Sequence, residues 1–278
     1  MRIGSEAHKE LFCRSFIASH REFDPEKLPW PDLDDAALER LQSLPFWGEA
    51  VATEQEAGLK ILAYGETVGD ALVREAITLQ AAEEMRHAAV IDALIQRYDI
   101  AWSARPIAPL PTDLEQGFVD VGYGECIDSF FAFGFFEIAR RSGFFPAALL
   151  TVVAPILEEE ARHIVFFVNW EAYHQHQRRG RVAPLRAARA LRYYTRAVRR
   201  RLGVFRNAAG TGFTIRGSQS VAVDVSPTSL LEICLQENAK RMADFDADLL
   251  RPRLVPALAR VALRSLSTFT RHPRHQGE

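Results

Sequence analysis

The pattern E-E-x-R-H occurs twice in this 278-residue chain, at residues 83–87 and at residues 159–163. In each copy the second glutamate and the histidine are three residues apart, so on an α-helix they lie side by side on one face. That face is apolar in both segments, with Ile91 near the first copy and Phe167 near the second. Each helix is therefore expected to carry a carboxylate and an imidazole into a hydrophobic core, where unpaired groups of this kind cost several kcal/mol each.

Helical periodicity surrounds both copies. Apolar residues recur at three- and four-residue intervals over residues 45–64, 68–98, 113–141 and 146–179, which predicts four long helices. The turn-like sequences GETVGD and RSGFFP separate the first helix from the second and the third from the fourth, so each pair is expected to form a hairpin. Pro155 is expected to bend the first part of the fourth helix. Because two hairpins in series bury four apolar stripes economically, the predicted fold class is all-α, with a four-helix bundle.

Further segments precede and follow this predicted bundle. Residues 1–44 are expected to form an N-terminal helical lead-in in which Ser5 can cap the first helix. Residues 45–180 form the bundle, and residues 181–278 form a basic C-terminal helical extension packed on it. Within the extension, the sequence NAAGTGFTIRGSQSVAVDVSP is typical of a loop or of short paired strands, and the tail after about residue 265 is expected to fray.

An arginine-rich segment, residues 178–206, belongs to this extension, and no acidic residue occurs between Glu171 and Asp224. We expect the segment to form an electropositive surface, although a formal net charge of −2 requires some of its arginines to pair with acids elsewhere. No nucleic-acid motif accompanies the arginines. An acidic partner protein, such as a carrier or a reductase, is therefore favoured over nucleic acid.

The two copies of the motif predict a metal pair in the bundle core. They place four ionisable side chains there, namely Glu84, His87, Glu160 and His163. Hard carboxylate oxygens with one imidazole per ion suit iron or manganese. Bundles that hold such a pair add one lone glutamate from each of the other two helices.

The first and third helices each offer such a glutamate. Glu54 lies 30 residues before Glu84, and Glu125 lies 35 residues before Glu160. Each hairpin turn falls about midway between its two glutamates, as an antiparallel pair of helices requires. The four carboxylates are therefore expected at one level of the bundle.

Other acidic residues compete for these positions. Glu56 replaces Glu54 if the register of the first helix slips. Glu137 competes with Glu125, but it lies too close to the following turn to meet the fourth helix at the required level. A third Glu-x-x-His, Glu171 and His174, is readily a chance occurrence and is interpreted as part of a solvated helix end.

In these features the chain resembles the ferritin-like diiron carboxylate proteins. The resemblance covers about residues 45–180 and rests on Glu54, EEMRH at 83–87, Glu125 and EEEARH at 158–163. It implies two Fe ions, or a Mn/Fe pair, that are bridged by carboxylates and react with O2. The catalytic and metal-binding set that it implies is Glu54, Glu84, His87, Glu125, Glu160 and His163.

The same resemblance suggests a role for the acid that directly precedes each Glu-x-x-His. In relatives of the monooxygenase and reductase type, this acid accepts a hydrogen bond from the histidine of the opposite pair. Glu83 and Glu159 occupy those places here, although aspartate is common there in the family. Such an acceptor is physically sensible because a metal-bound imidazole needs a partner for its other N–H group. Arg86 and Arg162 are expected either to neutralise these acids or to be solvated.

The third helix suggests where a substrate binds. It is unusually aromatic after Glu125, and the residues expected nearest the substrate are Phe131, Ala132, Phe135 and Phe136. Most of these rings are explained by ordinary core packing. Apolar side chains next to an oxidising metal pair also exclude water from a reactive site, which favours a small apolar or carrier-bound organic substrate.

Three functions are consistent with these patterns. The best supported is an O2-dependent oxygenase or oxidase that hydroxylates, N-oxygenates or desaturates its substrate, like the arylamine N-oxygenases or the fatty-aldehyde and fatty-acid oxidising enzymes. Such an enzyme can require an external electron donor. A ferroxidase or a Mn/Fe radical-type protein is the second function, and a metal-free helical interaction protein is the third. A homodimer is compatible with each.

Composition excludes several other classes. The chain is 48% hydrophobic and 25% charged, which is typical of a folded globular protein. The three cysteines are isolated, so neither a disulfide framework nor a cysteine zinc site is indicated. No apolar run approaches the roughly 18 residues of a membrane span, and the N-terminus lacks the apolar stretch of a secretory signal. A cytoplasmic location is therefore expected.

Overall fold

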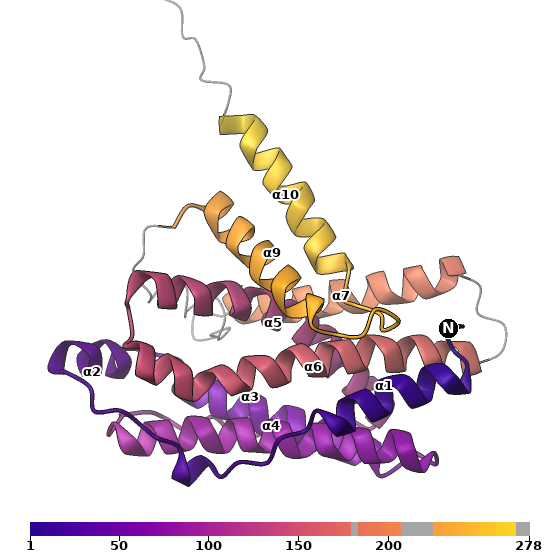
Figure 1. Ribbon diagram of the computed structural model, residues 1–278, viewed down its shortest axis with the longest axis horizontal. Coiled ribbons are helices and arrows are strands. Elements are labelled where there is room, and N and C mark those ends of the chain that lie inside the picture. Colours follow the sequence, from indigo (N-terminus) through magenta and orange to yellow (C-terminus); the bar gives the residue numbers. More distant parts are fainter. Residues whose placement is uncertain (179–182, 207–224, 271–278) are drawn as a thin grey trace, which may run out of the picture.

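The computed structural model describes residues 1–178, 183–206 and 225–270, and within these ranges all regular structure is helical (Figure 1). The predicted all-α class is confirmed. The helices in chain order are α1 (Glu6–Ala18), the short 3-10 turn η1 (Pro25–Lys27), α2 (Asp35–Gln42), α3 (Trp47–Gly65), α4 (Ala71–Arg97), α5 (Leu114–Ser142), α6 (Ala147–Gln177), α7 (Ala183–Arg206), α9 (Pro227–Ala243) and α10 (Leu254–Thr270). The predicted loop or strand pair at residues 207–224 and the end of the tail, residues 271–278, lie outside the described residues.

Local sequence signals explain where the long helices begin and end. The Ser5 side chain accepts a hydrogen bond from the backbone N–H of His8, as expected for an N-cap. Asp70 caps α4 and Asp113 caps α5 in the same way. Gly143 ends α5 in the left-handed conformation, with φ of 64°, which glycine adopts without strain. Helix α6 continues through Pro155 to Gln177.

Helices α3, α4, α5 and α6 pack side by side around a common core. Helix α3 contacts α4 and α5, and α6 contacts α5 and α4, so each of the four has two neighbours within the set. Helix α5 approaches α6 very closely, because a Cβ atom at Gly122 would lie 2.2 Å from the ring of Phe167. The predicted long helices thus exist and pack together.

The flanking helices cover different sides of this core. Helix α1 lies against both α4 and α6, so it covers the side on which the two E-E-x-R-H motifs occur (Figure 1). Helices α7 and α9 lie on α5, and α10 packs on α9 and projects from the body of the molecule. All three cysteines are buried free thiols. Among the described helices, none is both long enough and apolar enough to cross a membrane.

Candidate metal centre

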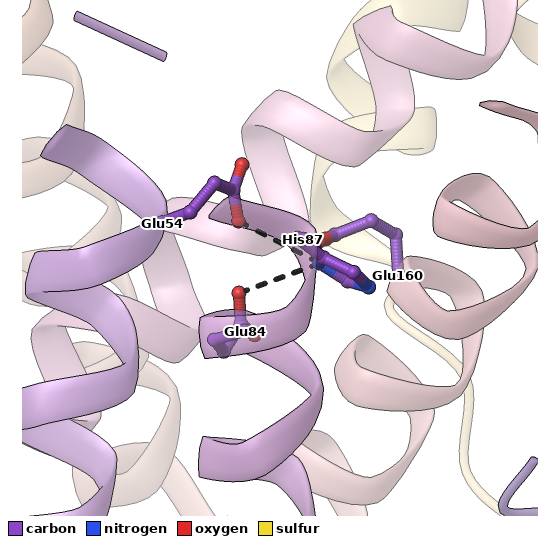
Figure 2. Close-up of side chains that lie close together, drawn as sticks. All are labelled: Glu54, Glu84, His87 and Glu160. Carbon is purple, nitrogen blue, oxygen red and sulfur yellow. Dashed lines mark ion pairs between the residues drawn. The ribbon is translucent and has the colours of Figure 1, made fainter. Parts of the chain in front are cut away.

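The structure brings all six sequence-predicted ligands together in two overlapping groups. One group contains Glu54, Glu84, His87 and Glu160 (Figure 2), and the other contains Glu84, Glu125 and His163. In each group the potential ligand atoms lie within 4.8 Å of one another. Glu84 belongs to both groups, so its carboxylate lies between two positions that a cation could occupy.

The Nδ1 atoms of the two histidines face these carboxylates. Nδ1 of His87 lies 3.6 Å from Oε2 of Glu54 and 3.4 Å from Oε1 of Glu160. Nδ1 of His163 lies 2.8 Å from Oε1 of Glu84 and 3.9 Å from the same Oε1 atom of Glu160. The second oxygen of Glu84 is 3.8 Å from Nδ1 of His87. Glu84 and Glu160 therefore each lie near both imidazoles, where a carboxylate can bridge two ions.

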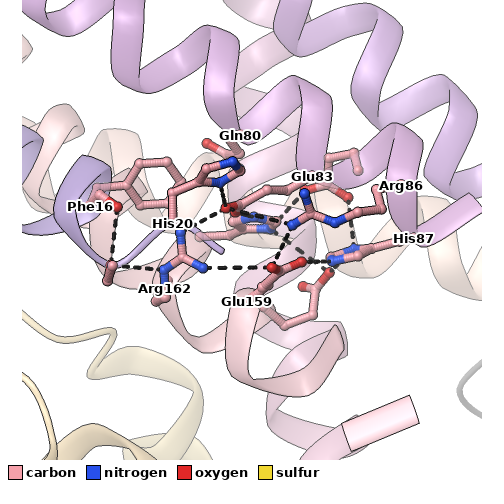
Figure 3. Close-up of polar contacts among 12 residues, drawn as sticks. Phe16, His20, Gln80, Glu83, Arg86, His87, Glu159 and Arg162 are labelled. Atoms are coloured by element: carbon pink, nitrogen blue, oxygen red, sulfur yellow. Dashed lines mark hydrogen bonds and ion pairs between the residues drawn. The ribbon is translucent and has the colours of Figure 1, made fainter. Parts of the chain in front are cut away.

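The outer nitrogens of the histidines are hydrogen-bonded across the two motifs (Figure 3). Nε2 of His87 lies 2.9 Å from Glu159, and Nε2 of His163 lies 2.7 Å from Glu83. Because an ionised carboxylate only accepts hydrogen bonds, each Nε2 carries a proton, and in the neutral imidazole Nδ1 then has a free lone pair. That tautomer is the one that binds a metal ion through Nδ1.

Two arginines complete the crossed arrangement. Arg86 donates to Glu159 at 2.5 Å, and Arg162 donates to Glu83 at 2.8 Å. Each arginine thus hydrogen-bonds the acid of the other motif and lies farther, at 4.0 and 3.8 Å, from the acid of its own. These four charged groups form two compact ion pairs outside the carboxylate cluster, which leaves the cluster itself without an arginine.

Several buried polar atoms at the centre have no hydrogen-bond partner. They are Nδ1 of His87, Nδ1 of His163, Oε1 of Glu84, Oε1 of Glu125 and Oε1 of Gln80. Orphaned buried atoms are costly, and here all but the amide oxygen are good ligands for a hard divalent cation. The residues present therefore fit a metal pair.

The acids and histidines of the cluster shift each other's pKa values: against the effect of burial, the neighbouring acids raise the pKa of His87 and of His163 well above the ordinary value. Burial raises the pKa of Glu54 to about 8, and the charges of Glu84 and Glu160 add to this rise while the nearby imidazole of His87 opposes it. Burial and the same two neighbours also raise the pKa of Glu125 well above its ordinary value. Four carboxylates cannot all ionise in one core without a compensating charge. Two divalent cations would balance four carboxylates while both imidazoles stay neutral.

The site is closed on its histidine side and more open on its carboxylate side. The side chains of His87 and His163 are 0% exposed, whereas those of Glu54 and Glu160 are 21% and 15% exposed. Helix α1 covers the histidine side through contacts with α4 and α6. Among these side chains, solvent therefore touches the centre through the carboxylates of Glu54 and Glu160.

Three polar residues near the site were missed in the sequence analysis. The Ser129 hydroxyl donates to Glu160 at 3.0 Å, and the Gln80 amide donates to Glu125 at 3.4 Å. Both could have been found by spacing, because Ser129 lies four residues after Glu125 and Gln80 lies four residues before Glu84. His20, which lies 2.5 Å from Glu83, gave no such signal, since it follows a separate helix far away in sequence.

The competing glutamates make other contacts. Glu56 accepts hydrogen bonds from Lys60, Arg105 and the backbone N–H of Ala108. Glu137 forms ion pairs with Arg140 and Arg141. Both acids are therefore neutralised by cationic groups of the chain, and neither belongs to the cluster of potential ligands in the described residues.

The third Glu-x-x-His is not part of a solvated helix end, so that expectation was wrong. Glu171 is only 5% exposed, and its carboxylate is paired with Arg189 at 3.4 Å and hydrogen-bonded to Gln175. His174 stacks on Trp170 and lies 3.2 Å from Glu115. The reason is that α7, which carries Arg189, lies on α5 and brings its arginine over the end of α6.

The predicted substrate-contacting residues of α5 border the hydrophobic core. Phe131 packs both against the main core and against the cluster that α5 forms with α9 and α10, and its ring stacks on Phe135 at 6.3 Å. Ala132 and Phe136 pack against the main core and lie seven and eleven residues after Glu125, which places them on its helical face. Their contact with a substrate stays a prediction.

The arginine-rich segment is neutralised in part. Arg178 and Arg189 pair with Glu115, and Arg196 pairs with Asp120 at 3.1 Å. Arg192 and Arg199 are exposed and line an open groove of about 670 Å³ together with Leu191. Among the described side chains of this segment, Arg192 and Arg199 therefore place positive charge on the outer face of α7.

Comparison of the chain with protein-family models, with curated proteins and with solved structures gives no match.

Proposed function

We propose that this protein has a ferritin-like four-helix bundle and is a nonheme diiron enzyme that uses O2 to oxidise a small apolar or carrier-bound organic substrate. The observation that carries the proposal is the overlap of the two groups of ligands at Glu84. A single Zn²⁺ or Ca²⁺ site does not need two imidazoles on opposite sides of shared carboxylates. A pair of redox-active ions bridged by carboxylates does.

Each ligand residue has a role that follows from its position. Glu84 and Glu160 lie near both histidines and would bridge the two ions. Glu54 lies on the His87 side and Glu125 on the His163 side, where each would bind one ion. Two iron ions held in this way supply the electrons and the oxidising power for O2 chemistry.

The protein itself controls protons, water and access. Glu83 and Glu159 hold the protons on the outer nitrogens of the histidines, so the inner nitrogens remain available as ligands. Helix α1 and the two arginine–glutamate pairs exclude water from the histidine side. The partly exposed carboxylate side leaves a route for O2 and substrate, and we place the apolar substrate next to Ala132 and Phe136 on α5.

A reductive oxygenation also needs a source of electrons. When one oxygen atom enters the product and the other leaves as water, two further electrons must come from a donor. The exposed arginines Arg192 and Arg199 on α7 would suit an acidic reductase or an acidic carrier protein. Charge reversal at Arg192 should then slow reduction by such a partner, and the effect should fade as salt is added.

The proposal is tested by loading the metal-free protein anaerobically with Fe(II) and then adding O2. Two Fe ions per chain and O2 uptake that rises with an apolar amine, aldehyde or fatty acyl substrate are expected, with an oxidised product found by mass spectrometry. Repeated oxidation of added iron with accumulation of ferric mineral, unaffected by any organic molecule, would instead establish a ferroxidase. Absence of stoichiometric metal binding would leave a helical interaction protein.

A further inference from the structure

The acid and arginine behind each histidine are arranged alike in the two halves of the metal centre, but Glu83 has a partner that Glu159 lacks. Glu83 and Glu159 each accept from one histidine and one arginine of the other motif. Glu83 has a further partner, because Nδ1 of His20 lies 2.5 Å from its Oε1 atom (Figure 3). Among the described residues, Glu159 has no equivalent histidine. The difference therefore lies only on the side of His163.

His20 is held in place by the end of α1. Its backbone N–H donates to the carbonyl of Ile17, and the preceding Ser19 accepts a hydrogen bond from Nε of Arg162 at 3.0 Å. The guanidinium of Arg162 also lies over the ring of Phe16, 4.9 Å from its centroid. Helix α1 is thus fixed to α6 beside the acid that His20 contacts. The His20 side chain is 15% exposed, so it forms the outermost member of this chain of contacts.

We propose that His20 is a positioning residue for the metal ion on the His163 side, an inference that rests on the proposed diiron function. The Nδ1–H group of His20 donates to one oxygen of Glu83 and holds that carboxylate in place. The other oxygen of Glu83 accepts the Nε2–H group of His163, which fixes the ring with its Nδ1 atom directed at Glu84. Because Glu159 lacks such a partner, the ion on the His87 side does not depend on His20.

The surroundings of Glu83 explain why one donor matters. Its side chain is 0% exposed and accepts from His20, Arg162 and His163. Both His20 and Arg162 contact Oε1 of Glu83, so loss of His20 leaves Arg162 as the one remaining donor to that buried oxygen, and the carboxylate is held less firmly against His163. Partners of ligating histidines typically change metal affinity by about 10- to 100-fold.

The experiment compares three variants with the wild-type protein. His20→Ala removes the donor, and His20→Asn restores an N–H group close to the position of Nδ1. Arg21→Ala is the matched control, because Arg21 is the next residue in the chain and pairs only with the exposed Glu158 in the described structure. Metal-free protein is titrated with Co(II) alone, and binding is followed by visible absorption and by equilibrium dialysis.

The expected result separates the two ions. Wild type and Arg21→Ala bind two Co(II) ions, whereas His20→Ala binds one ion normally and the second at least about tenfold more weakly. His20→Asn recovers the second ion. Equal affinity for both ions in His20→Ala, or an equal loss of both ions, overturns the proposal.

A second measurement does not depend on metal. In ¹⁵N-labelled metal-free protein, the Nε2–H proton of His163 should exchange with water faster in His20→Ala than in wild type, while that of His87 is unchanged. Identical exchange at His163 in the two proteins also overturns the proposal. If wild type binds no Co(II), the diiron function fails, and the exchange measurement alone then decides whether His20 positions Glu83 and His163.

Discussion

Helix α6 carries two Glu-x-x-His pairs, and they obtain their positive charge from different sources. Glu160 and His163 belong to the candidate metal centre, where none of the described ion pairs joins a ligand carboxylate to lysine or arginine. Glu171 and His174 belong to a second cluster, which we call the arginine-paired cluster and which also contains Glu115, Arg178 and Arg189. The two clusters share the same local sequence pattern and differ in their neighbours.

This difference shows what a buried acid–histidine pair requires. In the arginine-paired cluster, the guanidinium of Arg189 lies 3.4 Å from Glu171 and 3.7 Å from Glu115, so the chain supplies its own cation. At the metal centre, Arg86 and Arg162 are near but contact Glu83 and Glu159 instead. The inner carboxylates are left for a cation from outside the chain. Motif spacing alone does not separate the two cases, whereas the location of the arginines does.

The largest expected effect is on iron content, which substitutions in the metal centre should lower and substitutions in the arginine-paired cluster should not. Glu84→Ala should reduce iron from two ions per chain to none, because its carboxylate lies next to both histidines. Glu171→Gln and His174→Ala should retain two ions, since their cluster already has arginines. Metal content is measured by inductively coupled plasma mass spectrometry after anaerobic reconstitution. Normal iron in Glu84→Ala would refute the assignment of the centre, and loss of iron in His174→Ala would refute the comparison.

Added metal should raise the free energy of unfolding only by binding at the candidate metal centre. Binding to the folded state adds about 2.7 kcal/mol at a free metal concentration 100 times the dissociation constant of a site. Added Mn(II) or Co(II) should therefore raise the free energy of unfolding of wild type and of Glu171→Gln by similar amounts, as measured by urea denaturation. Glu84→Gln, which keeps the side-chain volume, should show almost no increase. A metal-induced increase in Glu84→Gln equal to that of wild type would show that the ions bind elsewhere.

Many features of the four long helices and of the candidate metal centre could be predicted from the sequence, because the residues concerned are spaced at helical intervals. The long helices followed from apolar periodicity, and Glu54 and Glu125 followed from their distances to Glu84 and Glu160. These spacings lie within one helix or within one helical hairpin, so a single amino-acid sequence is enough to identify them. The structure places these acids with both histidines, although their metal-binding role stays a proposal.

The remaining features depend on contacts between segments far apart in sequence. His20 reaches Glu83 only because α1 lies against α4 and α6. Glu171 is buried and paired only because α7 brings Arg189 over the end of α6. The spacing of residues within one helix does not predict which other helix packs against it. For this reason the sequence analysis predicted that the end of α6 is solvated, whereas in the structure Glu171 lies buried in the arginine-paired cluster.

A smaller effect tests whether Arg189 is the counterion of the second cluster. Arg189→Leu should lower the free energy of unfolding by about 2 kcal/mol, because it leaves the buried Glu171 without its cation. The double variant Arg189→Leu/Glu171→Gln should recover much of the loss, since the unpaired charge is then gone. Arg192→Leu on the exposed face of α7 is the control and should change little. A loss in the double variant as large as in Arg189→Leu would assign the effect to packing rather than to charge.

The smallest expected effect concerns the pH dependence of the same acid. Burial raises the pKa of Glu171 above its ordinary value of 4.5, and the attraction of Arg189 only partly opposes this. A carboxyl whose folded-state pKa is raised is destabilising when ionised. That cost is fully present above the folded-state pKa, decreases as the pH falls through it, and is absent below 4.5. Glu171→Gln should therefore increase the free energy of unfolding near neutral pH, and this advantage over wild type should shrink as the pH is lowered toward 4.5.

Urea denaturation of the metal-free proteins across this pH range measures the advantage, with Glu158→Gln, an exposed acid on the same helix, as the control. If the advantage instead grew on acidification, Glu171 would be stabilised in its ionised form, and the arginines of its cluster would compensate its burial completely.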